Sequence, residues 1–68
     1  EDKQKAMQYY KQASDYHYSK ASFMLGYMYH YGDGTSKDLK KAKEYYQLAL
    51  QDGYLEAQKE LDKLEVEK

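Results

Sequence analysis

The side chains best suited to chemistry in this 68-residue sequence gather in one short stretch, His30 to Asp38, around a Gly-Asp-Gly turn. An imidazole near Asp33 and Asp38 is the beginning of a metal site, but zinc needs three or four ligands in fixed geometry. No second histidine stands at helical spacing from the first. We therefore predict no metal site, and we interpret His30 as an exposed residue late in a helix, where a cation is favourable.

A glycine-rich turn can also cradle a phosphate, but this one lacks the required context. A phosphate-binding loop follows a strand and has a Lys-Ser/Thr pair opening the next helix, and the sequence shows neither feature. Four lysines near the turn form a local basic patch that Asp38 and Glu44 interrupt: Lys37, Lys40, Lys41 and Lys43. We interpret this patch as a solvated helix face rather than an anion site.

Nucleophilic catalysis needs a serine or cysteine beside a base that a third group orients. The sequence has no cysteine, and its serines stand at helix edges and turns without a matching His-Asp arrangement. The second histidine, His17, falls in a predicted turn, where we expect a structural role. The sequence therefore predicts a protein that is not an enzyme and needs no cofactor.

Composition narrows the classes of partner. The 11 basic residues are all lysine and nearly balance 12 acidic ones, whereas nucleic-acid surfaces usually show a basic stripe with arginine. No apolar run approaches the roughly 18 residues of a membrane span. The ten tyrosines are unusual in so short a chain, and many large rings with polar tips suggest half-buried helix faces.

An internal repeat organises these residues. The segment KAMQYYKQA (5–13) aligns with KAKEYYQLA (41–49) at an offset of 36 residues, and the same offset places Tyr18 on Tyr54 and Leu25 on Leu61. Apolar residues recur at i, i+3, i+4 and i+7 within each copy, which is one face of a helix. We predict four helices, near 2–14, 18–31, 38–52 and 54–66, packed as antiparallel hairpins in an all-α solenoid.

Several residues define the expected ends and contacts of these helices. Asp38 is a natural N-cap, Gly53 a natural stop, and the glycines of the 32–34 turn can take positive φ. Gly26 flanks the apolar face, where a missing side chain lets a neighbouring helix approach closely. The expected buried residues are Ala21, Leu25, Tyr29, Ala42, Tyr45, Tyr46 and Ala49.

The stretch from Ala21 to Gly53 resembles the SEL-one-like repeat, a relative of the tetratricopeptide repeat. Its Ala, Leu-Gly, Tyr, Gly-x-Gly, Asp, Lys-Ala, Tyr-Tyr, Ala and Gly elements occupy the positions of that family's pattern. Thr35 and His17 depart from it, since the family usually has valine and glycine there. The resemblance implies a helical-repeat adaptor that acts in complex assembly and signalling.

The alignment also suggests how the chain divides. One full unit, about 18–53, is flanked by half-units 1–17 and 54–68, and we expect the whole to belong to a longer array. Residues 54–68 replace apolar positions of the second helix by charged ones, among them Lys59, Asp62 and Glu65, as a terminal cap would. With its first helix unpartnered, we expect Met7 and part of Tyr9 or Tyr10 to be exposed.

The predicted helix at 18–31 carries the candidate partner-binding residues. Phe23, Tyr27 and Tyr31 form a stripe opposite Leu25 and Tyr29, and Lys20 and His30 flank it. Such a stripe either packs on the adjacent repeat or lines a groove that binds a protein or peptide. Binding of carbohydrate or a peptidoglycan fragment is the alternative, although the usual Trp and Asn are missing.

Overall fold

The computed structural model describes residues 2–67 and contains four α-helices in that range. They are α1 (Lys3–Asp15), α2 (Ser19–Tyr31), α3 (Leu39–Gln51) and α4 (Ala57–Glu67). Each predicted helix is present, and no strand occurs among the described residues. The all-α architecture predicted from the 36-residue repeat is confirmed.

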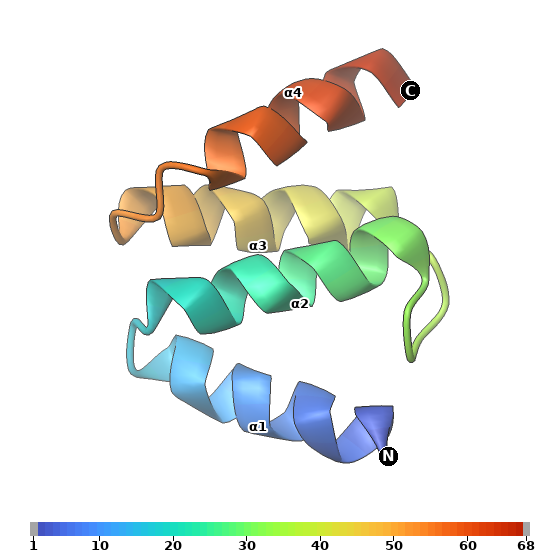
Figure 1. The fold of residues 1–68 in the computed structure, drawn as a ribbon, viewed down its shortest axis with the longest axis vertical. Helices are drawn as coiled ribbons and strands as arrows, with labels where there is room; N and C mark the ends of the chain where they lie inside the picture. The colour runs from blue at the N-terminus through green and yellow to red at the C-terminus, as the bar shows by residue number, and fades with distance from the viewer. Residues whose placement is uncertain (1, 68) are drawn as a thin grey trace.

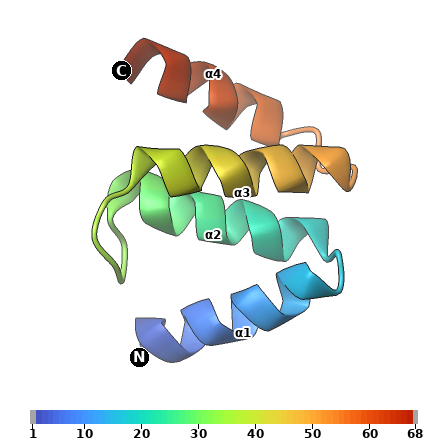
Figure 2. The ribbon, with the colours of Figure 1, turned by 180° about the vertical axis from the view of Figure 1, so that it is seen from behind.

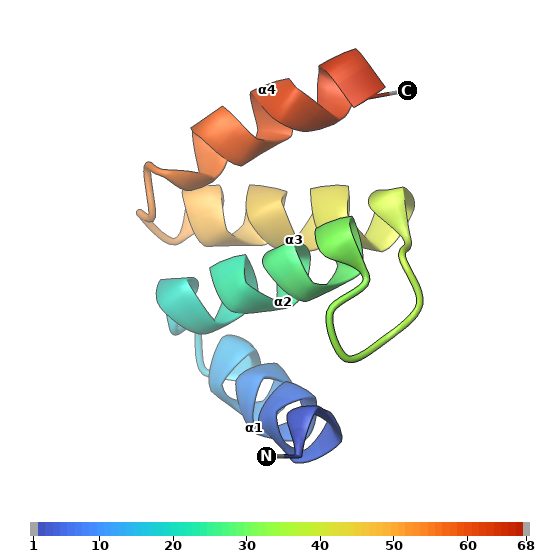
Figure 3. The ribbon, with the colours of Figure 1, turned by 45° about the vertical axis from the view of Figure 1, so that its right-hand side comes forward.

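Successive helices run in opposite directions and stack in chain order from α1 to α4 (Figure 1). Seen from behind, α3 lies in front of α2, and these two central helices make the most extensive contact (Figure 2). The stack measures 30 × 25 × 16 Å. The turned view shows the 32–38 connection reaching down from the α2–α3 pair toward the start of α1 (Figure 3).

The helix ends follow from local sequence. Asp2 and Asp38, one repeat apart, both cap a helix N-terminus: Asp38 Oδ1 accepts from the Lys41 backbone N–H at 3.1 Å. Gly32 ends α2 in the left-handed conformation at φ 69°. His17 takes that conformation too, at φ 66°, in the place that Gly53 fills one repeat later. The predicted caps and stops are confirmed.

We expect Asp38→Ala to lower the free energy of unfolding by about 1 kcal/mol, because the N-terminus of α3 loses its side-chain acceptor. Asp38→Asn is the matched control, since its side-chain oxygen can still accept the Lys41 N–H bond. Chemical denaturation of the three proteins measures the difference. Equal losses in both variants would mean that the charge, rather than the cap hydrogen bond, stabilises this end.

The core lies between α2 and α3 and extends to α4. Leu25, Ala42, Tyr46 and Ala49 are inaccessible to solvent, and Ala21 and Tyr29 are buried, as the repeat pattern predicts. Tyr45 is only half-buried, with its ring stacked on Tyr29 at a centroid distance of 5.8 Å. Alanines at the helix contacts let the backbones come close enough for tyrosine rings to fill the remaining space.

Gly26 is the closest contact between α2 and α3. A Cβ atom built at this position would lie 2.5 Å from Cδ1 of Tyr46, inside the distance that carbon atoms tolerate. The ring of Tyr46 therefore packs directly on the backbone of α2. The predicted close approach at Gly26 is confirmed.

The expected exposure of Met7 is wrong, since its side chain is only 8% exposed. Met7 belongs to the same buried cluster as Leu25 and Met28, because α1 packs against α2. The 32–38 connection also closes over the start of α1, through a Lys3–Asp33 ion pair. Tyr9, in contrast, is 64% exposed, as predicted for this helix.

Candidate functional site

The outer face of α2 presents two neighbouring tyrosines. Tyr27 is 41% and Tyr31 49% exposed, and their ring centroids lie 4.8 Å apart at an interplanar angle of 52°. Lys20 is exposed near the start of the same helix, on the same side, because 7 and 11 residues are close to whole numbers of turns. The structure thus brings Lys20, Tyr27 and Tyr31 onto one accessible face.

Phe23 lies one helical step away and belongs to the interior. Its ring centroid is 4.8 Å from that of Tyr54 and 5.5 Å from that of Tyr46, and the side chain is partly buried against the core. The stripe that the sequence defines is therefore divided between two environments. Its first aromatic residue joins helices α2, α3 and α4, and its last two face outward.

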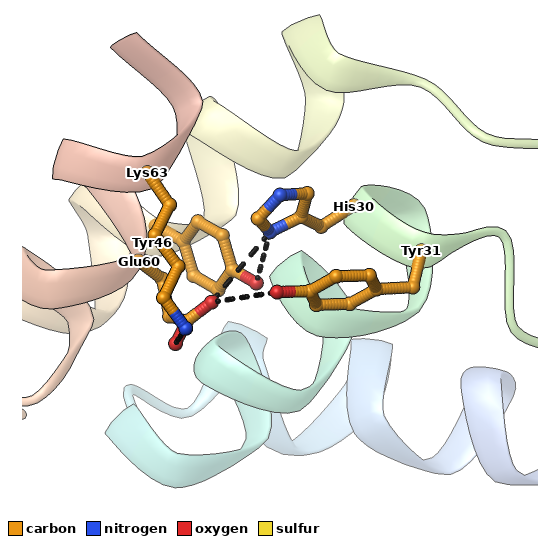
Figure 4. Close-up of polar contacts among 5 residues, drawn as sticks. All are labelled: His30, Tyr31, Tyr46, Glu60 and Lys63. Atoms are coloured by element: carbon orange, nitrogen blue, oxygen red, sulfur yellow. Dashed lines mark hydrogen bonds and ion pairs between the residues drawn. The ribbon is translucent and has the colours of Figure 1, made fainter. Parts of the chain in front are cut away.

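His30 is fully buried, so the expectation of an exposed histidine is wrong. Its Nδ1 atom lies 3.1 Å from the hydroxyl oxygen of Tyr46 on α3 and 3.7 Å from Oε1 of Glu60 on α4 (Figure 4). The ring reaches both helices because it stands on the side of α2 that faces them. A partner cannot touch this side chain in the observed arrangement, although it positions residues that a partner can reach.

A polar network connects this buried histidine to the surface. The Tyr31 hydroxyl donates to Oε1 of Glu60 at 3.3 Å, and Lys63 Nζ donates to Oε2 of the same carboxylate at 3.2 Å (Figure 4). The Tyr31 ring also stacks on His30 at 4.1 Å and 20°. Tyr31 is therefore held by α4 in one orientation while half of its surface stays accessible.

A second concave feature lies between α1 and α2 and was not predicted from the sequence. It is a groove of about 620 Å³ lined by Tyr9, Tyr10, Ala13, Tyr18, Lys20, Ala21 and Met24. Of the predicted partner-binding residues, only Lys20 lines it. The spacing of tyrosines on each helix suggested half-buried faces, but only the packing angle of α1 on α2 creates the groove.

Two tyrosines have altered acidity. Burial, assisted by neighbouring Tyr29, raises the pKa of the Tyr45 phenol. A hydrogen bond with Glu56 raises the pKa of Tyr54, because the bond favours the protonated phenol. Both side chains keep their protons, and so their capacity to donate, to a higher pH than a free tyrosine.

Other candidate residues lie apart from these features. His17 Nδ1 is 3.3 Å from Oδ2 of Asp52, which joins the two inter-repeat turns at the surface. Residues 2–67 contain no group of three His, Cys, Asp or Glu side chains arranged to hold a metal ion. Within the same range, no helix has the length and apolar character needed to cross a bilayer.

Antiparallel helices in a 36-residue repeat define an α-solenoid repeat protein. The family model described as Sel1 repeat matches residues 1–15 and 19–54, so the chain belongs to the Sel1 repeat family. Sel1 repeats commonly mediate protein–protein interactions and are typically non-catalytic scaffold modules. Neither a curated protein nor a solved structure matches the chain significantly.

Proposed function

We propose that this chain is a protein-interaction module that binds a partner protein or peptide through the exposed face of α2, formed by Lys20, Tyr27 and Tyr31. The observation that carries the proposal is the adjacent Tyr27–Tyr31 pair, in contact with each other and each close to half exposed. Tyrosine anchors protein interfaces because it buries a large area at a low entropic cost.

The fixed orientation of Tyr31 strengthens this proposal. Its hydroxyl is bonded to Glu60, so a partner that packs on the ring does not have to immobilise it. The role that we propose is that of an adaptor without catalytic activity, working within a larger repeat array or assembly. Sugar binding gains no support from this face, since the sequence contains no Trp or Asn to accompany the rings.

The test separates binding from stability in the Tyr27→Ala, Tyr31→Ala double variant. Partners are first captured with the unchanged chain and identified, and their dissociation constants are then measured against each variant. We expect at least a tenfold weaker complex, roughly the loss of one interface hot spot of about 2 kcal/mol. The expected loss of thermal stability is small, because both rings are substantially exposed.

Tyr16→Ala is the matched control, since Tyr16 is a more exposed tyrosine outside this face. It should leave both quantities unchanged. Lost stability with unchanged affinity in the double variant would assign the tyrosine pair to the interior of a stacked array instead. Binding of soluble peptidoglycan fragments, weakened by the same double substitution, would favour the sugar alternative over a protein partner.

A further inference from the structure

The groove between α1 and α2 repeats the construction of a site that is filled elsewhere in the same molecule. The 36-residue offset relates four groove residues to residues of α3 and α4: Tyr9 to Tyr45, Tyr10 to Tyr46, Ala13 to Ala49 and Ala21 to Ala57. In the second unit α2 itself lies against these positions, and Tyr46, Ala49 and Ala57 are completely buried. In the first unit the corresponding surface is open.

The filled site shows which features a helix needs in order to fit. Gly26 of α2 rests on the Tyr46 ring, with no room for a Cβ atom. Phe23, three residues earlier, packs on Tyr46, and Tyr29, three residues later, stacks on Tyr45. A small residue flanked at both sides by aromatic residues, each three positions away, is therefore the pattern that matches a Tyr-Tyr-x-x-Ala surface.

One difference between the two sites changes the required chemistry. His30, four residues after Gly26, faces Glu60 in the filled site, whereas the groove has Met24 at the position of Glu60. A buried imidazole opposite a thioether would lose the ionic partner that Glu60 provides, and burying a polar group without a partner is costly. The groove therefore favours an apolar side chain at that position of an incoming helix.

We propose that the α1–α2 groove is a docking site for an amphipathic helix of the α2 type. Its pattern is an aromatic residue, a small residue three positions later, an aromatic residue three further on, and an apolar residue directly after that. This surface is separate from the Tyr27–Tyr31 pair, so the inference does not depend on the function proposed above. Its basis is continuity with an interface already formed inside the molecule.

The probe is a fluorescein-labelled peptide with the sequence of residues 18–32 carrying His30→Leu. Fluorescence anisotropy measures its affinity for the full chain, and amide NMR shifts locate where it binds. We expect shifts at Tyr9, Tyr10 and Ala13, and binding about tenfold tighter than that of the unchanged peptide. Adding Gly26→Leu to the probe should weaken binding by tenfold or more, because the larger side chain meets the Tyr10 ring.

A reciprocal substitution in the chain makes the pose specific. Met24→Glu recreates the carboxylate of the filled site, so it should reverse the preference and make the unchanged peptide the tighter ligand. Leu55→Ala, at an exposed position outside the groove, should alter neither affinity. Circular dichroism of the Met24→Glu chain checks that it is folded.

Three results would overturn the inference. The first is no binding of the probe to the folded chain, and the second is binding that is insensitive to Gly26→Leu in the peptide. The third is self-association of the chain that Tyr10→Ala abolishes in sedimentation experiments. That result would give the groove to a second copy.

Discussion

We expect Gly26→Ala to lower the free energy of unfolding by about 3 kcal/mol, the upper end of the usual cost of overpacking. The added methyl group would lie 2.5 Å from Cδ1 and 2.6 Å from Cε1 of Tyr46. The ring cannot move away easily, because it is fully buried and packs on Phe23 and His30. Helices α2 and α3 would have to separate, which loosens the central contact of the fold.

The sign of this effect is the informative part. At an exposed helix position alanine is favoured over glycine by about 1 kcal/mol, because glycine loses more backbone entropy. The pair Lys43→Gly and Lys43→Ala on the exposed side of α3 measures that intrinsic preference in the same protein. Chemical denaturation should show alanine stabilising at position 43 and destabilising at position 26. Stabilisation at both positions would contradict the close contact.

The second large effect concerns the buried pair of His30 and Tyr46. Tyr46→Phe removes the hydroxyl 3.1 Å from His30 Nδ1, and we expect a loss of about 1–3 kcal/mol, since a buried polar group then loses a hydrogen bond. His30→Leu should cost a similar amount, because it removes the same bond and also the ring stacked on Tyr31.

A double-mutant cycle identifies the interaction itself. With both substitutions present, the loss should be smaller than the two single losses combined, by about 1 kcal/mol, because the hydrogen bond is removed only once. The unfolding free energies of the four proteins supply the result. Additivity within about 0.5 kcal/mol would show that the two side chains do not interact across α2 and α3.

Local sequence determines most of the helix boundaries. The caps at Asp2 and Asp38 and the left-handed Gly32 place the ends of α1, α2 and α3 within a residue of the prediction. The start of α4 is the exception, at Ala57 instead of Tyr54. Residues 54–56 form a tight turn with bonds between residues three apart, such as Ala57 N–H to Tyr54 C=O at 3.0 Å, before the α-helical pattern begins.

The burial of His30 could not be predicted from the periodicity of one helix. On α2 alone it borders the aromatic stripe and resembles a polar edge residue. Only the arrival of α4 beside α2 and α3 places Tyr46 and Glu60 around it. The same limit applies to Met7 and to the α1–α2 groove, since both depend on how two helices cross and not on the pattern within either.

The central claim is that the exposed face of α2 contacts a partner protein. Site-specific photo-cross-linking tests it most directly, with a benzophenone amino acid replacing Tyr27 in one protein and Tyr16 in the control. Both positions are exposed tyrosines, but only the first belongs to the proposed face. Irradiation in a lysate of cells that express the chain, followed by mass spectrometry, identifies whatever protein is attached at each position.

The account predicts a discrete covalent adduct with one partner at position 27 and none with that partner at position 16. Excess unlabelled chain should compete the adduct away, because a specific site is saturable, whereas the Tyr27→Ala, Tyr31→Ala chain should compete poorly. Equal labelling at both positions, or a folded protein that forms no adduct at position 27, would contradict the claim that α2 presents a binding face.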